Sequence, residues 1–324
     1  MPSYNKQILA EKAKELSVVR DTLEKVMRLR DILEFFDSSE LLSESLALKG
    51  GTAINLIFFD LPRLSVDIDL DFCNNISRKE MLIKRGEIGK QIEKYMLANG
   101  YTLSPKSKTP HSLDSFVYSY TNAAGVTDNI KIEINYSLRS HVLPTAKREI
   151  KSGAFDGSFT VNTVSPIEIY ASKTVALLTR AAARDLYDLN HMICSKPFKD
   201  NELELYRKCV IFYSAIATQT PPTEFDFSSV DSITAHKIKT DLKPVIRVKD
   251  EFDLEEAKKA VTEFLNQNLY ITEQEQLFLK KFKKGYYKPE LLFDDEETLK
   301  RIKNHPMAIW KTNKNRDKRD KQER

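Results

Sequence analysis

The chain has 324 residues, of which 41% are hydrophobic and 30% are charged, and its formal net charge is +4. This length predicts about two domains with a proper core, and the mild charge permits a nucleic-acid partner without requiring one. No apolar run approaches the roughly 20 residues that cross a bilayer. The first residues also lack the basic-then-apolar pattern of a secretion signal. We therefore expect a cytoplasmic protein without membrane attachment, acting as a monomer.

The three cysteines, Cys73, Cys194 and Cys209, lie far apart in the sequence and show no C-x-x-C spacing. Disulfide frameworks and zinc sites need closer or more numerous cysteines. We expect plain thiols in or near the core, which fits a reducing compartment.

The first part of the chain predicts helices, followed by a region of strands. Within residues 5–46, leucines recur at helical spacing, as at Leu9, Leu16 and Leu23. Short apolar or alternating runs then predict strands at residues 46–48, 66–72, 116–120 and 130–136. A helix between the second and third of these strands is predicted to begin with a capping box of Ser77 and Glu80 and to end at Asn99 and Gly100.

The second half of the chain predicts mostly helices, beginning at a boundary near residue 165. Ser165 and Glu168 have the spacing of a capping box, and we expect one helix from there to about Ile193. Thr272 and Glu275 predict the start of a later helix that Gly285 ends. From Thr312 onward no apolar periodicity remains, which indicates a disordered basic tail.

These patterns predict an α+β fold in three parts. Residues 1–165 would hold N-terminal helices and an α/β domain with a small mixed sheet. Residues 166–311 would form a mostly helical domain, and residues 312–324 the tail.

The run Arg63-Leu64-Ser65-Val66-Asp67-Ile68-Asp69-Leu70-Asp71 carries the clearest chemical signal. On a strand, alternation places Ser65 and the three aspartates on one face and the apolar residues on the other. Neighbouring carboxylates at this spacing repel by on the order of 2 kcal/mol, so the face needs a compensating charge. Mg²⁺ or Mn²⁺ provides one, since it binds a few carboxylates and shares its other positions with phosphate oxygens and water. Asp71 is expected to face water instead.

Two further segments supply partners for Asp67 and Asp69. On the alternating strand 130–135, Glu133 is a candidate third metal ligand, because two-metal nucleotidyl transfer needs an acidic cluster. The turn Gly50-Gly51-Thr52 lies between a strand and a predicted helix, where glycines let a triphosphate approach the backbone. Lys49 or Arg63 would add a cation there.

The helix predicted from residue 166 aligns Lys173, Arg180, Arg184 and His191 within about 20° of one line. A row of cations suits a phosphate chain or an RNA backbone, whereas the alternative is an ordinary solvated face. Asp185 would orient one of these cations or act as a general base.

The segment 280–288 interleaves five lysines with Phe282, Tyr286 and Tyr287. Together with the basic tail it suits RNA binding. The alternative is a helix kept soluble by lysines while its aromatic residues fill the core.

Taken together, these motifs resemble the AbiEii family of abortive-infection toxins, which has a polymerase-β-like nucleotidyltransferase fold. The resemblance extends from about residue 45 to 311. It rests on residues 49–56 (KGGTAINL) and 63–71 (RLSVDIDLD), and is supported by the Lys173–Asp188 pattern and residues 304–311 (NHPMAIWK).

The resemblance implies the toxin of a type IV toxin–antitoxin system, active in phage defence and neutralised by an AbiEi-like antitoxin encoded nearby. It implies that the protein uses Mg²⁺ and an NTP to extend the 3′ end of tRNA, which blocks translation. Together with the residue patterns above, it leads us to assign Asp67, Asp69, Lys173 and Asp185 to catalysis and Asp67, Asp69 and Glu133 to the metal. Nucleotide binding would then fall to Lys49, Gly50, Gly51, Thr52, Arg63, Ser65 and Arg180.

Two other functions remain open on the sequence. The same residues would serve nucleotidyl transfer to a protein hydroxyl. A second possibility is an NTP-binding module without turnover, although the intact D-x-D motif and Glu133 argue against it.

Overall fold

The computed structural model describes residues 4–59, 61–150, 157–196, 198–219 and 221–322. The chain divides into two compact units. The sheet unit comprises Met1–Arg139, Thr145–Val164 and Lys243–Asp250, and the helical unit comprises Ser140–Pro144, Ser165–Leu242 and Glu251–Arg324. The chain therefore passes between the units more than once, which the sequence did not indicate.

The sheet unit begins with three helices, as the N-terminal pattern predicts. They are α1 (Lys6–Leu16), α2 (Arg20–Ser38) and α3 (Glu40–Ser45). The α2 side chains Leu29, Ile32 and Leu33 are fully buried. This helix therefore supplies much of the apolar surface that holds the N-terminal region on the unit.

Seven strands form one mixed sheet in the order β3-β4-β5-β2-β1-β7-β6. The central β2 runs antiparallel to β1 and parallel to β5. The strands are β1 (Leu46–Lys49), β2 (Asp67–Phe72), β3 (Thr102–Leu103), β4 (Leu113–Thr121), β5 (Thr127–Asn135), β6 (Ala146–Glu149) and β7 (Thr160–Thr163). The four predicted strands correspond to β1, β2, β4 and β5, whereas the short β3, β6 and β7 gave no signal in the sequence.

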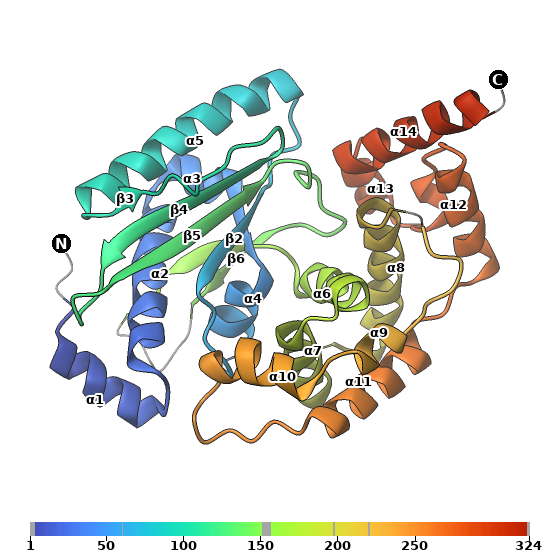
Figure 1. Ribbon diagram of the computed structural model, residues 1–324. Coiled ribbons are helices and arrows are strands. Elements are labelled where there is room, and N and C mark those ends of the chain that lie inside the picture. The colour runs from blue at the N-terminus through green and yellow to red at the C-terminus, as the bar shows by residue number, and fades with distance from the viewer. Residues whose placement is uncertain (1–3, 60, 151–156, 197, 220, 323–324) are drawn as a thin grey trace. The chain divides into compact units, whose positions relative to one another are not determined.

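The long helix α5 (Arg78–Ala98) lies between β2 and β3 in the chain and runs along β3 and β4 (Figure 1). The predicted capping box of Ser77 and Glu80 is present, which confirms the start of the helix. Ile88, Ile92 and Met96 are fully buried and form its packing face. Asn99 is the C-cap, so the predicted end is confirmed as well.

The connection from β1 to β2 is helical at its start. It consists of α4 (Gly50–Ala53) and the π-helix η1 (Ile54–Phe58). Because β1 and β2 are antiparallel neighbours, this connection returns the chain directly to the first residues of β2.

The helical unit is built from helices that vary widely in length. The longer ones are α6 (Pro166–Arg180), α7 (Ala183–Ser195), α8 (Asp200–Ala217), α11 (Leu254–Asn268), α12 (Glu273–Lys283) and α14 (Pro306–Gln322). The shorter ones are α9 (Ser228–Asp231), α10 (Ala235–Lys237), η2 (Ile238–Leu242), η4 (Pro289–Leu291) and α13 (Glu296–Ile302). No helix in the described parts of the chain is long and apolar enough to cross a membrane. The predicted Thr272–Glu275 capping box is present.

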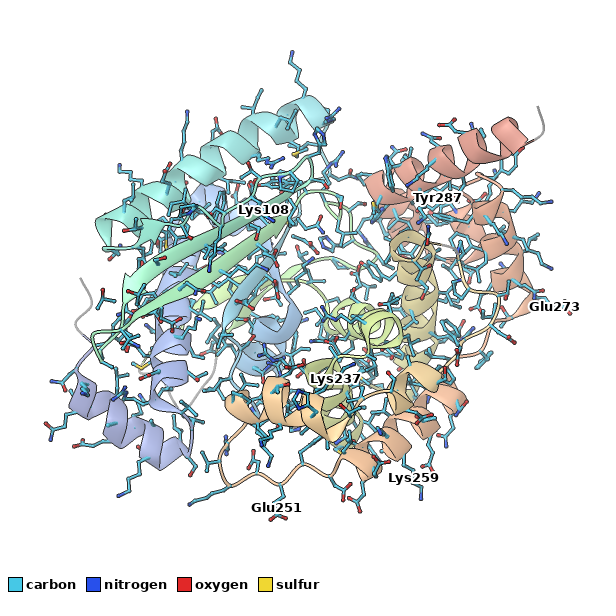
Figure 2. The ribbon with its side chains drawn as sticks, in the orientation of Figure 1. Lys108, Lys237, Glu251, Lys259, Glu273 and Tyr287 are labelled. Carbon is cyan, nitrogen blue, oxygen red and sulfur yellow. The ribbon has the colours of Figure 1, made fainter. Side chains whose placement is uncertain are left out.

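The prediction of one helix from residue 166 to about 193 is wrong. Ala181 adopts a left-handed conformation with φ of 48° and ends α6, and α7 starts two residues later. The Nζ atom of Lys237 donates a hydrogen bond of 3.2 Å to the Ala181 carbonyl, which satisfies an acceptor that the broken helix leaves open. Figure 2 labels Lys237. The break invalidates the predicted row of cations along a single helix.

The predicted capping box at Ser165 is also absent, because Glu168 has another role. Its carboxylate accepts hydrogen bonds from the backbone N–H groups of Val142 and Leu143 at 2.9 and 2.8 Å and from the Tyr213 hydroxyl. Burial raises the pKa of Glu168, although these hydrogen bonds and His141 act in the opposite direction. Glu168 therefore binds the segment Ser140–Pro144. This segment belongs to the helical unit, although the residues before and after it in the chain belong to the sheet unit.

The prediction of a disordered tail is wrong for residues 312–322, which belong to α14. The first turns of α14 are tied to the end of α12. Asn315 donates a hydrogen bond to the Phe282 carbonyl at 3.2 Å, and Arg316 donates one to the Gly285 carbonyl at 2.9 Å. Thr312 is buried as well. Packing against the rest of the helical unit therefore stabilises α14, although its sequence has no apolar stripe. Residues 323 and 324 lie outside the described residues.

The cysteines are free thiols as predicted, but they do not all lie in or near the core. Cys209 is buried and Cys73 is partly exposed, whereas Cys194 is exposed.

Candidate functional site

Asp67 and Asp69 lie on one face of β2, as the alternation of residues predicts. Both are partly exposed, whereas Ile68 and Leu70 between and beyond them are buried on the opposite face. Within the described residues, the Asp67 carboxylate makes no hydrogen bond and no ion pair. A partly buried carboxylate in that state has its negative charge available for a ligand.

The Gly50-Gly51 turn lies directly against this face. Gly50 has φ of +67°, and a Cβ atom there would stand 2.7 Å from Oδ2 of Asp69. A Cβ atom on Gly51 would stand 2.5 Å from a guanidinium nitrogen of Arg63 and 3.1 Å from Oγ of Ser65. Position 50 therefore requires glycine, because of its positive φ and its contact with Asp69, whereas a side chain at position 51 would displace the end of the Arg63 side chain.

A buried hydrogen-bond network holds the turn in place. The hydroxyl of Thr52, which is fully buried, is hydrogen-bonded to the Asp67 carbonyl oxygen and, at 2.9 Å, to Oγ of Ser65. Asn55 donates a hydrogen bond of 2.6 Å to the Gly51 carbonyl. The turn is therefore fixed to β2 before any ligand binds.

Arg63 belongs to the same network. Its backbone N–H donates to Oδ1 of Asn55 at 3.1 Å, and its guanidinium donates to the Leu64 carbonyl at 3.2 Å. The residue is only 3% exposed. The assignment of Thr52, Ser65 and Arg63 to nucleotide binding stays a prediction, since the contacts described here hold the fold together.

Asp71 differs from its two neighbours and contradicts the expectation that it faces water. It is 3% exposed, and its carboxylate forms an ion pair with Nζ of Lys49 at 2.5 Å. The pair forms because β1 and β2 are antiparallel neighbours, with Lys49 opposite Asp69. The positive charge of Lys49 therefore neutralises Asp71 in this structure.

Glu133 is brought beside the aspartates, but it has a cation of its own. The parallel register places Glu133 opposite Asp69 and Lys131 opposite Asp67. Nζ of Lys131 lies 2.9 Å from Oε2 of Glu133. Partial burial by itself would lower the pKa of the Lys131 amine. The hydrogen bond and negative charge of Glu133, together with the charges of Asp67 and Asp69, outweigh burial and raise this pKa above its usual value. Sequence reasoning overlooked Lys131, although its i, i+2 spacing from Glu133 places both on one strand face.

The two aspartates suit a divalent cation that also binds a phosphate substrate. The described residues contain no group of three or more His, Cys, Asp or Glu side chains arranged to hold a metal by themselves. Mg²⁺ does not require such a group, because it is commonly bound through one or two carboxylates and the phosphates of its substrate. The backbone of Gly50, which carries no side chain, lies against the Asp69 carboxylate, so phosphates bound to such a cation could approach this backbone closely.

The helical unit contains a second cluster of predicted site residues. Nζ of Lys173 on α6 lies 2.8 Å from the carboxylates of both Asp185 and Asp188 on α7. Arg180 adds two hydrogen bonds to Asp185, at 2.8 and 3.0 Å. Both aspartates are 1% exposed. The sequence motif thus folds into one ion-pair network even though the single helix is broken.

The cations set the protonation state of Asp185. Burial alone would raise the pKa of its carboxyl, but the charge of Lys173 and the hydrogen bond from Arg180 outweigh burial and lower it. Asp185 is therefore a weak base, which favours a role in positioning Lys173 and Arg180 over proton abstraction.

Arg184 and His191 each make a contact that a single helix does not predict. Nε of Arg184 donates a hydrogen bond of 2.7 Å to the Asp241 carbonyl. The imidazole of His191 stacks on Tyr187 with 6.1 Å between ring centroids.

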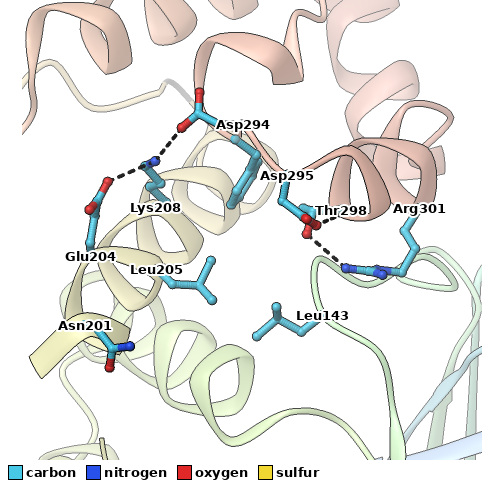
Figure 3. Close-up of a pocket in the computed structure, with 10 residues that line it drawn as sticks. Leu143, Asn201, Glu204, Leu205, Lys208, Asp294, Asp295, Thr298 and Arg301 are labelled. Carbon is cyan, nitrogen blue, oxygen red and sulfur yellow. Dashed lines mark hydrogen bonds and ion pairs between the residues drawn. The ribbon is translucent and has the colours of Figure 1, made fainter. Parts of the chain in front are cut away.

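A pocket of about 490 Å³ lies in the helical unit between α8 and α13 (Figure 3). Lys208 in its wall pairs with Glu204 and Asp294 at 3.0 and 3.2 Å. None of the residues predicted to bind the nucleotide or metal lines this pocket. Arg301 in the same wall donates hydrogen bonds to the Val142 carbonyl and to the Thr298 hydroxyl.

Comparison with known proteins identifies the family. A family model described as the nucleotidyl transferase AbiEii toxin of type IV toxin–antitoxin systems matches residues 35–285. The chain belongs to this AbiEii family. The resemblance inferred from the sequence motifs is thereby confirmed, and so is the prediction of a nucleotidyltransferase.

Solved structures support the fold of this AbiEii protein. MenT4, a nucleotidyltransferase toxin from Mycobacterium tuberculosis H37Rv, matches with a TM-score of 0.64 and 15% identity, covering 95% of this chain and 99% of that one. The predicted α+β nucleotidyltransferase fold is therefore confirmed. The Cid1 poly(U) polymerase matches with a TM-score of 0.29 and 11% identity over 82% of this chain and 74% of that one, too distant to support an argument. No curated protein matches the sequence.

Proposed function

We propose that this AbiEii-family protein transfers a nucleotide from an NTP to the 3′ hydroxyl of an RNA, with the tRNA 3′ end as the acceptor. The observation behind this proposal is the Asp67–Asp69 pair, partly exposed on β2 and bordered by a turn that requires glycine at position 50. As the toxin of a type IV system, the protein would block translation in the cytoplasm and be neutralised by an antitoxin encoded nearby.

In this reaction the acceptor 3′ oxygen bonds to the α-phosphorus of the NTP, the bond from that phosphorus to the bridging oxygen breaks, and pyrophosphate leaves. Mg²⁺ or Mn²⁺, when bound, lowers the charge on the phosphates and on the attacking oxygen. Asp67 and Asp69 would hold it, while Glu133 stays a predicted third ligand that must first release Lys131. The Gly50-Gly51 backbone would lie against the phosphates.

Lys173 and Arg180 of the helical unit are proposed to bind phosphate. Arg180 suits this role because its side chain is 63% exposed, although its guanidinium is oriented by Asp185. Lys173 is 11% exposed and is held by two carboxylates, so its ammonium is fixed in one place. Asp185 would then act by orienting both cations.

The test is incubation of the protein with total RNA, purified tRNA and each α-labelled NTP in the presence of Mg²⁺. We expect label on RNA and release of pyrophosphate. RNA whose terminal ribose has been opened with periodate should accept no label, because it lacks the 3′ hydroxyl. Label on protein alone would show transfer to a protein hydroxyl instead. NTP binding without pyrophosphate release under all conditions would identify a non-catalytic module and overturn the proposal.

A further inference from the structure

The end of α12, the turn after it and α14 form a strongly basic surface in the helical unit. Residues 280–290 and 303–317 contain nine lysines and arginines against two acidic residues, a net charge of +7. The whole chain has a net charge of +4, so the remainder carries −3. This concentration of cations on a limited part of the chain favours a polyanionic partner.

Two large aromatic side chains are exposed within this basic surface. Trp310 on α14 is 52% exposed, and Tyr286 in the turn after α12 is 43% exposed. Each ring has a cation beside it: Nζ of Lys314 lies 4.9 Å from the Trp310 ring centroid, and the guanidinium of Arg316 lies 5.8 Å from that of Tyr286. The buried Phe278 and Phe282 of the same region fill the core, whereas Trp310 and Tyr286 expose much of their rings to solvent.

Trp310, Lys314 and Arg316 are all exposed on α14, but they do not lie on one line along the helix. At 100° per residue, Lys314 lies about 40° from Trp310 in one direction and Arg316 about 120° in the other. The rise along the axis from Trp310 to Arg316 is about 9 Å. Trp310 therefore begins an exposed strip of α14 that continues through Lys314 toward the C-terminus, whereas Arg316 lies on the side toward the turn after α12.

The turn after α12 fixes Tyr286 beside that strip. Gly285 has φ of +87°, and a Cβ atom there would stand 2.8 Å from Cβ of Arg316. Arg316 also donates a hydrogen bond of 2.9 Å to the Gly285 carbonyl, which keeps the two residues in contact. The position of Tyr286 relative to Arg316 is thus set before any partner arrives.

We propose that this surface, defined by Tyr286, Trp310, Lys314 and Arg316, binds a single-stranded segment of RNA. Aromatic faces stack on unpaired bases, and neighbouring lysines and arginines bind the phosphates between them. A duplex hides its base faces, and an acidic protein would use the cations but not the rings. The inference takes from the proposed function only that the partner is RNA, and it does not depend on the transfer chemistry.

The single tryptophan of the chain is itself the probe. An unstructured oligo(U) RNA is titrated into the Asp67→Asn variant without NTP, and the intrinsic fluorescence of Trp310 is followed. We expect saturable quenching that weakens with salt, with a log–log slope of about −0.7 per phosphate contact. Lys314→Ala should raise the Kd a few-fold and reduce the slope by about 0.7. Lys259→Ala on the exposed side of α11, a residue well separated from Tyr287 in Figure 2, is the matched control and should change neither.

Anisotropy of labelled oligo(U) separates stacking from simple burial of apolar surface. Stacking on one base contributes about 1–3 kcal/mol, so Trp310→Leu should raise the Kd by about 5-fold or more, and Trp310→Phe by less. RNA binding without a change in Trp310 fluorescence would overturn the inference. So would unchanged binding by Trp310→Leu, equal binding of a perfect duplex, or the same quenching by poly-glutamate. These results would not contradict the proposed nucleotidyl transfer, because that activity is measured separately on protein with Trp310 intact.

Discussion

The sheet unit and the helical unit each contain a pair of nearby aspartates, and the fold treats the two pairs differently. On α7, Asp185 and Asp188 are both buried and share the ammonium of Lys173, with Arg180 also bound to Asp185. On β2, the Asp67 carboxylate has no hydrogen bond or ion pair within the described residues, and it remains partly exposed. The sequence spacing of the two pairs does not reveal this difference.

The difference shows how an acidic cluster is divided between stability and chemistry. A buried carboxylate must be neutralised by the protein, and removing its cation leaves an uncompensated charge. A carboxylate that the protein leaves without a cation is available to a metal or substrate. Asp71 demonstrates the rule within a single strand, because four residues beyond Asp67 it is buried and paired with Lys49.

The largest effect on activity is expected at β2. Asp67→Asn or Asp69→Asn should lower nucleotide transfer by at least roughly 10²-fold, the range for loss of one charge-stabilising group. Thermal unfolding should be unchanged or slightly improved, since one of two repelling charges is removed. Transfer rates and melting temperatures measured on the same preparations check this, and near wild-type turnover by either variant would place the active site elsewhere.

The largest effect on stability is expected at Lys173. Lys173→Ala leaves Asp185 and Asp188 buried without their shared cation and should destabilise the protein by about 3–5 kcal/mol. Adding Asp185→Asn and Asp188→Asn to Lys173→Met should recover most of that loss, because no buried charge remains. Chemical denaturation measures both. An equally unstable triple variant would show that the network does not set the stability of this region.

Lys173→Arg separates binding from stability, because it keeps the positive charge. If Lys173 binds phosphate, this variant should fold but recover NTP use only partly, since a planar guanidinium replaces a compact ammonium. The KM for NTP is the measurement, and a wild-type value would limit Lys173 to a structural role.

A smaller loss is expected at Asp71. Asp71→Asn should lower stability by about 1–2 kcal/mol, because Lys49 is partly exposed and regains water when the pair is broken. Transfer activity should change far less than in Asp67→Asn. The reverse order, with activity more sensitive at Asp71 than at Asp67, would contradict the division between paired and available carboxylates.

The Asp185 network also predicts a pH dependence. An unfolded aspartate titrates near pH 4, and the folded pKa of Asp185 lies lower. Its stabilising contribution is therefore complete above about pH 4 and is lost as the pH falls through the folded pKa. The difference in unfolding free energy between wild type and Asp185→Asn should shrink below pH 4. A difference that stays constant from pH 6 to pH 3 would argue against a charged Asp185.

The smallest effect is expected at the C-terminal end. Residues 318–324 contain four basic and two acidic residues. Deleting them should weaken RNA binding only modestly and leave the KM for NTP unchanged, with a slightly shallower salt dependence. Deletion from residue 312 is a poorer test, because it removes the contacts of Asn315 and Arg316 with the end of α12. A strong loss of NTP use in the shorter deletion would contradict a role limited to RNA.

The sequence predicted the parts that depend on local pattern. Alternation along residues 64–71 was sufficient to place Asp67 and Asp69 on one face, and the glycines marked the turn. The break at Ala181 gave no signal, since three consecutive alanines favour a helix and the tertiary contact of Lys237 lies far along the chain. The pairing of Lys49 with Asp71 could not be predicted, because it depends on the register between β1 and β2, which the sequence does not reveal. The α14 helix likewise depends on contacts with Phe282 and Gly285 that no periodicity reveals.

Binding of Mn²⁺, measured by the loss of its free electron paramagnetic resonance signal in the presence of a non-reactive NTP analogue, tests the central claim most directly. It reports on Asp67 and Asp69 without requiring an RNA acceptor or turnover. Wild type and Asp71→Asn should bind Mn²⁺ with similar affinity, and Asp67→Asn at least roughly 10-fold more weakly, as expected for loss of a carboxylate ligand. Equal affinity in Asp67→Asn and wild type would contradict the assignment of the metal to β2.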